Sequence, residues 1–278
     1  MIALFNVHRH YLALRDLIGF LIQHHLLIFE LAKREISDRY LGQVFGLFWT
    51  LVHPMIMMLV YVFIFAFVFR SKFGGTYELP LDHTTYLLAG LIPWIVFQDA
   101  ITKAGTVMFG HANLVKQLVF PVEVLPIKGV FASLVTQIIF LTMLITYVLV
   151  KNGALPWTYS LLPLLLLLQT MTMIGVSYIL SALSVYFRDI KDFIQIFSFS
   201  GLFLSPIFYL PSSMPEAARP ILYLNPLSCM IWSYQDALYF GRFEHPWAWV
   251  VFAFLSVSVL IIGFRFFRKL KVMFGNVL

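Results

Sequence analysis

Four charged residues fall within five consecutive positions of the segment SVYFRDIKDFIQ (residues 184–195): Arg188, Asp189, Lys191 and Asp192. The stretches before and after this group, residues 152–187 and 193–215, contain no Asp, Glu, Lys or Arg. A turn between two apolar segments needs only small residues such as Gly and Ser. Mixed charge, by contrast, suits a surface that a partner holds through charge-assisted hydrogen bonds. We therefore interpret the segment as a contact site for a partner outside the apolar segments.

The sequence lacks the patterns of P-loop nucleotide hydrolysis and of metal chemistry. No G-x-x-x-x-G-K-[ST] motif is present, so this chain does not hydrolyse ATP by that route. The eight histidines form no H-E-x-x-H or H-x-x-x-H pair, and the single Cys229 excludes an intrachain disulfide and a cysteine-cluster metal site. We expect no cofactor and no metal in this chain. Asp99 and Lys103, one helical turn apart, are the best candidates for buried charges, and we interpret them as an i,i+4 pair reaching the cytoplasmic interface.

The composition is that of a polytopic membrane protein. Hydrophobic residues make up 61% of the 278 residues and charged residues 12%, whereas an ordinary soluble domain is about half apolar and about a quarter charged. Apolar runs predict six membrane-spanning helices, at roughly 45–69, 86–108, 126–150, 160–186, 193–210 and 246–267. The expected fold is one all-α membrane domain over residues 1–278, with its six-span region at 45–267.

The basic residues indicate the orientation of these spans. Lys and Arg are concentrated in the N-terminal segment, the second and fourth connecting segments and the C-terminal tail. Because cytoplasmic segments collect basic residues, we predict that both termini and the FRDIKD segment lie in the cytoplasm. The net charge of +6 has the same origin and does not indicate nucleic-acid binding.

The N-terminal segment is amphipathic. Residues 17–29 are too short and too polar to span a membrane, and no small-residue cleavage site follows them. Apolar residues recur at helical spacing opposite polar ones: Leu21, Ile22, His25, Ile28, Phe29, Ala32 and Ile36 against Gln23, Glu30, Arg34 and Asp38. This pattern predicts a helix that lies in the membrane interface.

The segment between the fifth and sixth predicted spans is too apolar for an ordinary loop. Its middle, residues 221–232, is too short to cross a membrane, and four prolines, Pro211, Pro215, Pro220 and Pro226, prevent one continuous helix. Two short helices over about 212–240, entering the membrane and returning, satisfy both constraints where protein covers them. An external amphipathic loop is the alternative.

Four motifs, in order along residues 30–240, resemble those of membrane permeases of polysaccharide-exporting ABC transporters. They are REISDRYLGQVFGLFWTLVHP (34–54), NLVKQLVFPVEVLP (113–126), FRDI (187–190) and SPIFYLPSSMPEAARPILYLNPL (205–227). Within the first, the matching positions are Arg34, Glu35, Arg39, Tyr40, Gly46, Trp49 and Pro54. The chain departs from the usual pattern at Leu41, Gln43, Val122 and Gln235.

This resemblance implies the export of an undecaprenyl-diphosphate-linked O-antigen-type polysaccharide across the bacterial inner membrane. It implies a homodimer that works with two copies of a separate ABC ATPase, which binds ATP and Mg²⁺. It also implies an interface helix near 12–38, coupling helices near 111–120 and 187–193, and re-entrant gate helices near 212–240.

The resemblance further implies roles for single residues. The ATPase-coupling candidates are Asn113, Lys116, Phe120, Arg188, Asp189 and Lys191. The candidates for contact with lipid headgroups are Arg34, Arg39 and Tyr40. The channel or gate candidates are Trp49, Tyr209, Tyr223, Asn225, Pro226 and Trp232.

Other functions remain open on the sequence. A permease for capsule, teichoic acid or another glycoconjugate would have the same build. An integral-membrane glycosyl- or acyltransferase would need clustered Asp, Glu or His at a membrane face, which the sequence does not show. A secondary transporter would need charges at mid-span and an internal repeat. A stoichiometric ATPase partner distinguishes an ABC exporter from the enzyme and from the secondary transporter.

Overall fold

The computed structural model describes residues 7–39, 41–64, 81–116, 120–209, 215–216 and 219–274, and these residues contain helices and turns but no strand. The α-helices are α1 (Val7–Gln23), α2 (His25–Asp38), α3 (Trp49–Phe63), α4 (His83–Gly110), α5 (Ala112–Val115), α6 (Val124–Asn152), α7 (Leu162–Tyr186), α8 (Ile190–Phe203), α9 (Arg219–Leu224), α10 (Pro226–Gln235) and α11 (Pro246–Leu270). The predicted all-α class is therefore confirmed for this part of the chain.

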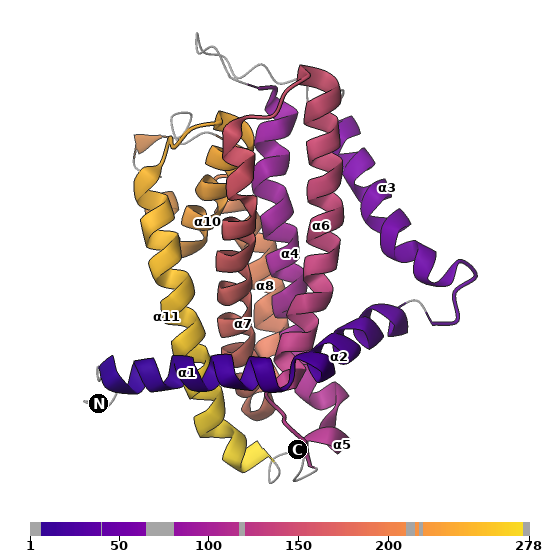
Figure 1. Cartoon of the computed structure of the whole chain (residues 1–278), viewed down its shortest axis with the longest axis vertical. Coiled ribbons are helices and arrows are strands. Elements are labelled where there is room, and N and C mark those ends of the chain that lie inside the picture. The colour runs from indigo at the N-terminus through magenta and orange to yellow at the C-terminus, as the bar shows by residue number, and fades with distance from the viewer. Residues whose placement is uncertain are drawn as a thin grey trace.

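The long helices form an upright bundle around α4, with α3 standing apart beside α6 (Figure 1). Helix α4 packs against α6, α7, α8 and α10, and α7 packs along α11. Five helical segments of the described chain are long and apolar enough to cross a membrane: Gly46–Phe63, His83–Gly110, Val124–Asn152, Trp157–Tyr186 and Pro246–Met273. They coincide with five of the six predicted spans.

Two glycines allow α7 and α11 to approach closely. A Cβ atom added to Gly263 would lie 2.1 Å from the carbonyl oxygen of Gly175, and one added to Gly175 would lie 2.5 Å from the carbonyl oxygen of Val259. Because no side chain fits there, the two backbones pack directly, as small residues permit in membrane helices.

The region predicted as the fifth span, 193–210, contains a shorter helix. Helix α8 has 14 residues, a length of about 21 Å at 1.5 Å per residue, whereas the hydrocarbon core is about 30 Å thick. The helix ends at Phe203, just before Pro206. Proline disfavours helical backbone in the residue that precedes it, here Ser205, which is a local reason for the helix to end. The described residues thus show five spanning candidates and not six.

The N-terminal segment forms two helices that lie across one end of the bundle (Figure 1). The break falls at His24, between α1 and α2, inside the single helix predicted over 12–38. Leu17, Ile28 and Ala32 are buried, whereas Ile22 and Phe29 are exposed. The apolar residues of the predicted amphipathic face are therefore divided between contact with the bundle and the free surface.

Two short helices occupy the proline-rich segment, with the break between them at Asn225. Helix α9 is followed by α10, and a π-helical turn, Asp236–Phe240, ends the segment. Every side chain from Ser228 to Gln235 is buried, and α10 packs mainly against α4 and α11. This confirms the predicted break in the helix and shows that α10 is covered by protein.

Candidate functional site

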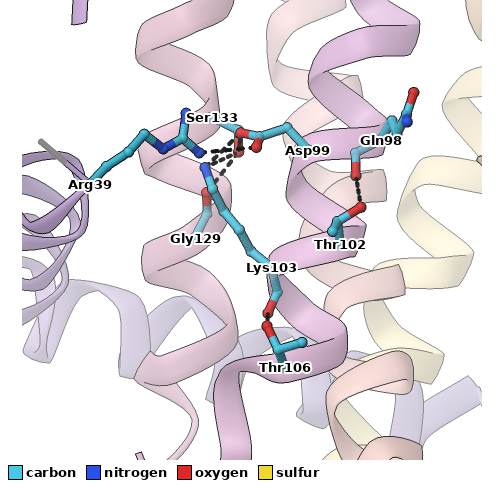
Figure 2. Close-up of polar contacts among 8 residues, drawn as sticks. All are labelled: Arg39, Gln98, Asp99, Thr102, Lys103, Thr106, Gly129 and Ser133. Atoms are coloured by element: carbon cyan, nitrogen blue, oxygen red, sulfur yellow. Dashed lines mark hydrogen bonds and ion pairs between the residues drawn. The ribbon is translucent and has the colours of Figure 1, made fainter. Parts of the chain in front are cut away.

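A network of charged side chains joins α2 to the bundle, with Asp99 of α4 at its centre (Figure 2). One carboxylate oxygen of Asp99 accepts a hydrogen bond from Arg39 Nη2 at 3.1 Å, and the other accepts from Lys103 Nζ at 2.6 Å. Ser133 of α6 lies 2.7 Å from that second oxygen and 2.9 Å from Lys103 Nζ. The predicted Asp99–Lys103 pair is confirmed, and it is part of a four-residue cluster from three segments.

A second ion pair ties α2 to the start of α6. Lys128 Nζ lies 2.7 Å from a carboxylate oxygen of Glu35 and 2.9 Å from Nε2 of His111. The Lys128 side chain is only 4% exposed. A charge this well shielded requires its partners, because an unpaired buried ammonium group is strongly unfavourable. We call the Asp99 cluster and this pair together the α2 ion-pair network.

The backbone of α6 makes room for this network at Gly129. A Cβ atom there would lie 3.3 Å from Cβ of Lys103, so a side chain at this position would crowd the lysine. The sequence motif around Arg34–Tyr40 indicated that Glu35 and Arg39 matter. It held no signal that Lys128 and Ser133 are their partners, because those contacts depend on how α2 crosses α6.

The same end of the bundle is closed by contacts between α6, α7 and α11. Glu123, just before α6, forms an ion pair with Lys271, just after α11. The hydroxyl group of Tyr186, at the end of α7, donates a hydrogen bond to the carbonyl of Leu270 at 3.2 Å. Asp16 of α1 pairs with Arg268 at 2.9 Å. These contacts join the ends of α6, α7 and α11, together with the middle of α1, into one base.

The charged group found in the sequence begins in the turn between α7 and α8 and continues into the first residues of α8, at this base. We call these four residues the α7–α8 turn. All four side chains of the α7–α8 turn are exposed: Arg188, Asp189, Lys191 and Asp192. Within the described residues, none of the four makes an ion pair or a side-chain hydrogen bond. The turn nevertheless rests on α4, since a Cβ atom at Gly105 would lie 2.6 Å from Cδ1 of Ile194 in the first turns of α8.

The other predicted coupling element lies at the same end of the bundle (Figure 1). Helix α5 covers Ala112–Val115 and is much shorter than the predicted 111–120, although 117–119 lie outside the described residues. Asn113 and Lys116 are exposed. Phe120 is half-buried and packs against the core, so it anchors the segment. Thus both candidate coupling elements lie toward the end of the bundle that α1 and α2 cross (Figure 1).

An aromatic cluster lies where α9, α10 and α11 meet, toward the end of the bundle at which α11 begins (Figure 1). The ring centroid of Tyr223 is 5.3 Å from that of Trp232 and 5.8 Å from that of Trp247. His245 stacks on Trp232 at 5.3 Å. Asp236, which is buried, accepts hydrogen bonds from the backbone N–H of His245 at 2.9 Å and from the Trp249 indole at 3.1 Å. Two gate candidates, Tyr223 and Trp232, are therefore in contact.

The remaining gate candidates lie elsewhere. Asn225 caps α10 by accepting from the Leu227 N–H at 3.1 Å, and Pro226 begins that helix. Tyr209 lies beyond the end of α8, and its hydroxyl donates a hydrogen bond at 2.6 Å to the carbonyl of Phe203, the last residue of that helix. Trp49 begins α3, and its ring centroid lies 5.9 Å from that of Phe45. The headgroup candidate Tyr40 lies outside the described residues.

Buried polar side chains hold α10 inside the bundle. The Tyr234 hydroxyl donates to Gln169 Oε1 at 2.5 Å, and Gln137 Nε2 donates to the same oxygen at 2.6 Å. Gln235 Nε2 donates to the Pro206 carbonyl at 2.8 Å. Sequence reasoning did not identify Gln137, Gln169 or Tyr234, because isolated glutamines in apolar runs carry no pattern.

A sequence profile of the ABC-2 type transporter family matches residues 27–239. The chain belongs to this family. The match confirms the resemblance drawn from the four motifs. In this ABC-2 family chain, the matched range includes most of α2, both candidate coupling elements and α10. Together with the five long apolar helices, the family identifies a multi-pass membrane protein.

Relatives of this ABC-2 chain extend the similarity over nearly its whole length. An O-antigen export system permease protein RfbA from Klebsiella pneumoniae is 26% identical over 254 residues, which is 91% of this chain and 95% of the relative. A protein of the same name from Myxococcus xanthus is 29% identical over 244 residues, or 87% of this chain and 90% of the relative.

Proposed function

We propose that this chain is the membrane subunit of an ATP-driven exporter that moves an undecaprenyl-diphosphate-linked O-antigen-type polysaccharide across the bacterial inner membrane. The observation that carries the proposal is the similarity to O-antigen export permeases over 91% of this chain and 95% of the relative. A full-length match supports a shared activity better than a match confined to one motif. The absence of a P-loop motif from the sequence agrees with ATP and Mg²⁺ binding in a separate ATPase.

The working unit in this proposal is a homodimer bound to two ATPase subunits. Two surfaces support an interface between copies. Helix α3 stands apart from the bundle, and its Leu59 and Phe63 are exposed. Helix α8 exposes Ile196 and Phe199. A second chain related by twofold symmetry would cover such faces with the same faces of its own.

The proposed membrane arrangement keeps six spans, with both termini in the cytoplasm. Helix α8 and the residues after it would together make the fifth crossing. Helices α1 and α2 would lie in the cytoplasmic interface, with Arg34 near lipid phosphates. Helices α9 and α10 would enter from the outer face and return, since α10 is buried by protein as non-spanning backbone at membrane depth requires. The Tyr223–Trp232 contact would then help to close the outer end of the path.

The α7–α8 turn and α5 would receive the motion of the ATPase. The turn is exposed and has charges without partners inside the described chain. It continues directly into α8, and Ile194 of α8 is in contact with α4 at Gly105. A displacement of the turn therefore reaches a spanning helix after one side-chain contact. Helix α4 in turn packs against α10, which connects the base to the aromatic cluster.

The coupling role is tested with Asp189→Arg. Removing one member of a hydrogen-bonded charge pair at an interface weakens it by roughly 2–5 kcal/mol. We expect the variant to insert and fold normally, to lose the ATPase on purification and to export little glycan. The matched control is Glu216→Arg, which reverses an exposed charge in a different segment. Normal ATPase retention together with normal export by Asp189→Arg would overturn the coupling role.

The transported substrate is tested by depleting the protein in its own bacterium. Export failure should reduce surface O-antigen while lipid-linked glycan accumulates inside the cell. Loss of capsule or teichoic acid with normal O-antigen would assign the other glycoconjugate function. Glycan that is never assembled, with no accumulation of the lipid-linked form, would point to an enzyme of synthesis and would contradict transport.

A further inference from the structure

A cavity of about 280 Å³ lies between α4, α7, α8 and the start of α10. Its lining includes Ile101 of α4, Leu180 of α7 and Phe197 of α8. The polar residue in its lining, Asn225, has its side chain engaged: the amide nitrogen lies 3.3 Å from the Leu204 carbonyl, and the oxygen caps α10. The cavity therefore offers hydrocarbon surface and no free polar side chain.

Such a cavity takes an apolar ligand and not water. Apolar cavities stay dry, and one of about 150 Å³ accommodates benzene. On that scale, 280 Å³ accommodates about ten carbon atoms of a hydrocarbon chain. The abundant hydrocarbon around a membrane protein is the acyl chain of a phospholipid.

In the proposed membrane arrangement the cavity lies at acyl-chain depth, and α8 forms its exposed side. Leu180 lies six residues before the end of α7 at Tyr186, which corresponds to about 9 Å along the helix. The α8 wall contains Phe193, which is 64% exposed, and Phe197, which is 38% exposed. A chain from the surrounding lipid would pass these two rings to enter. Phe197 is turned about 100° around α8 from Ile196 and about 160° from Phe199, the two residues of the face proposed for the second copy.

A cation lies at the end of the cavity nearest the α7–α8 turn. Lys191 precedes Ile194, a lining residue, by three positions, so both share one face of α8. The Lys191 Cα atom lies 3.9 Å from the place a Cβ atom on Gly105 would take, and Gly105 is one turn beyond Ile101. Lys191 is exposed, and so are Asp189 and Asp192. Lys191 is the one of these three that lies three positions before Ile194, and Asp192 is turned about 100° away from Lys191 around the helix. An apolar cavity with a cation at its end matches an anionic amphiphile.

We propose that this cavity is a binding site for one acyl chain of an anionic glycerophospholipid of the surrounding bilayer, with the lipid phosphate held by Lys191. The bound lipid would fix the start of α8 against α4 and α7, next to the turn that we assign to ATPase contact. The site does not depend on which substrate is exported.

Native mass spectrometry of the full-length protein tests the cavity. The purified protein is exposed to phosphatidylglycerol and phosphatidylethanolamine, and bound lipids are counted per chain. We expect one retained phosphatidylglycerol, and its loss from Leu180→Trp, which fills the cavity. The matched control is Leu167→Trp, the same change at an exposed position of α7. If Leu180→Trp is not monodisperse, the smaller change Val176→Phe in the same lining replaces it.

Lys191→Gln tests the headgroup contact. A basic residue near a membrane surface favours anionic lipid by an amount that corresponds to roughly a fivefold change in affinity. We expect Lys191→Gln to reduce the preference for phosphatidylglycerol over phosphatidylethanolamine about fivefold, while Lys269→Gln, at the exposed end of α11, leaves it unchanged.

Three outcomes would overturn the proposal. Full retention of the lipid by the cavity-filling variant would place the lipid elsewhere. A wild-type dimer that carries no lipid, together with weaker dimerisation of Leu180→Trp, would show that a second copy of the chain fills the cavity. Displacement of phosphatidylglycerol by undecaprenyl phosphate at a much lower concentration would identify a site for the exported lipid. If only the export proposal were wrong, the results for lipid retention, for headgroup preference and for displacement by undecaprenyl phosphate would be unchanged.

Discussion

The α2 ion-pair network and the α7–α8 turn are alike in composition and opposite in organisation. Both contain acidic and basic side chains, and both lie in the half of the bundle that α1 and α2 cross. In the network, Asp99 contacts two cations and a hydroxyl group, and Lys128 contacts Glu35 and His111. In the turn, the four charged side chains have no such partners within the described residues.

The difference separates charges that build the fold from charges that are free to bind another molecule. Removing one member of a paired and shielded charge destabilises the fold, because the remaining charge has neither its partner nor water around it. Exposed charges keep their hydration and contribute little to stability. The network therefore explains how α2 is attached to α4 and α6. The stability of the fold does not account for the charges of the turn, so we assign them to contact with another molecule.

The largest effect on stability is expected for Asp99→Asn. The change removes the carboxylate that contacts both Arg39 and Lys103, and the Lys103 side chain is only 15% exposed. Breaking a fully buried pair destabilises by about 3–5 kcal/mol. Because the Asp99 side chain is 31% exposed, we expect a loss nearer about 2–4 kcal/mol. The loss in the free energy of unfolding is measured in detergent, with size exclusion chromatography as the readout. Asp192→Asn is the matched control in the turn. Equal losses in the two variants would contradict the distinction.

A smaller effect is expected for Glu35→Gln. Lys128 loses its carboxylate but keeps the contact with His111, so we expect a loss of about 1–3 kcal/mol, the range for a buried group that loses a hydrogen-bond partner. Adding Lys128→Met should restore most of that stability, because a buried pair is often replaced by apolar residues without loss. A double variant less stable than Glu35→Gln would show that Lys128 has a further stabilising role.

The same distinction applies to a paired charge at the other end of α4. Burial raises the pKa of Asp82, but hydrogen bonds from Thr85, Lys151 and Tyr147 outweigh it and hold this pKa below its ordinary value. A carboxylate with a lowered pKa stabilises the fold above its unfolded pKa, and this stabilisation is lost as pH falls through the folded pKa. We expect the wild type to lose roughly 1 kcal/mol by this route as pH falls below about 4. Thermal unfolding between pH 6 and pH 3 should show this loss, and Asp82→Asn should lack it. An unchanged pH dependence in the variant would assign acid sensitivity to other groups.

The sequence predicted the elements of both regions better than their contacts. The i,i+4 spacing correctly indicated the Asp99–Lys103 pair, because both residues lie on one helix. Arg39 and Ser133 join them from other helices, and helix crossing leaves no local signal. Apolar length predicted six spans, and five of them match long helices of the described residues. The predicted fifth span contains the shorter α8, and the end of this helix before Pro206 depends on local backbone restrictions that hydrophobicity does not register. The break at His24 likewise divides a pattern that looked continuous.

The smallest effect on stability is expected for the double variant Arg188→Gln, Asp192→Asn. This variant separates the two roles of charge, because stability and ATPase binding are measured on the same protein. Exposed charges without partners contribute about 0–1 kcal/mol, so the free energy of unfolding should change by less than about 0.5 kcal/mol. A charge-assisted contact with the ATPase would nevertheless be weakened. The same preparation is therefore examined for ATPase retention. Unchanged stability with reduced retention would show that these charges bind a partner and do not build the fold. A loss of stability like that of Asp99→Asn would mean that the turn is paired within the folded protein, and unchanged retention would remove Arg188 and Asp192 from the ATPase contact.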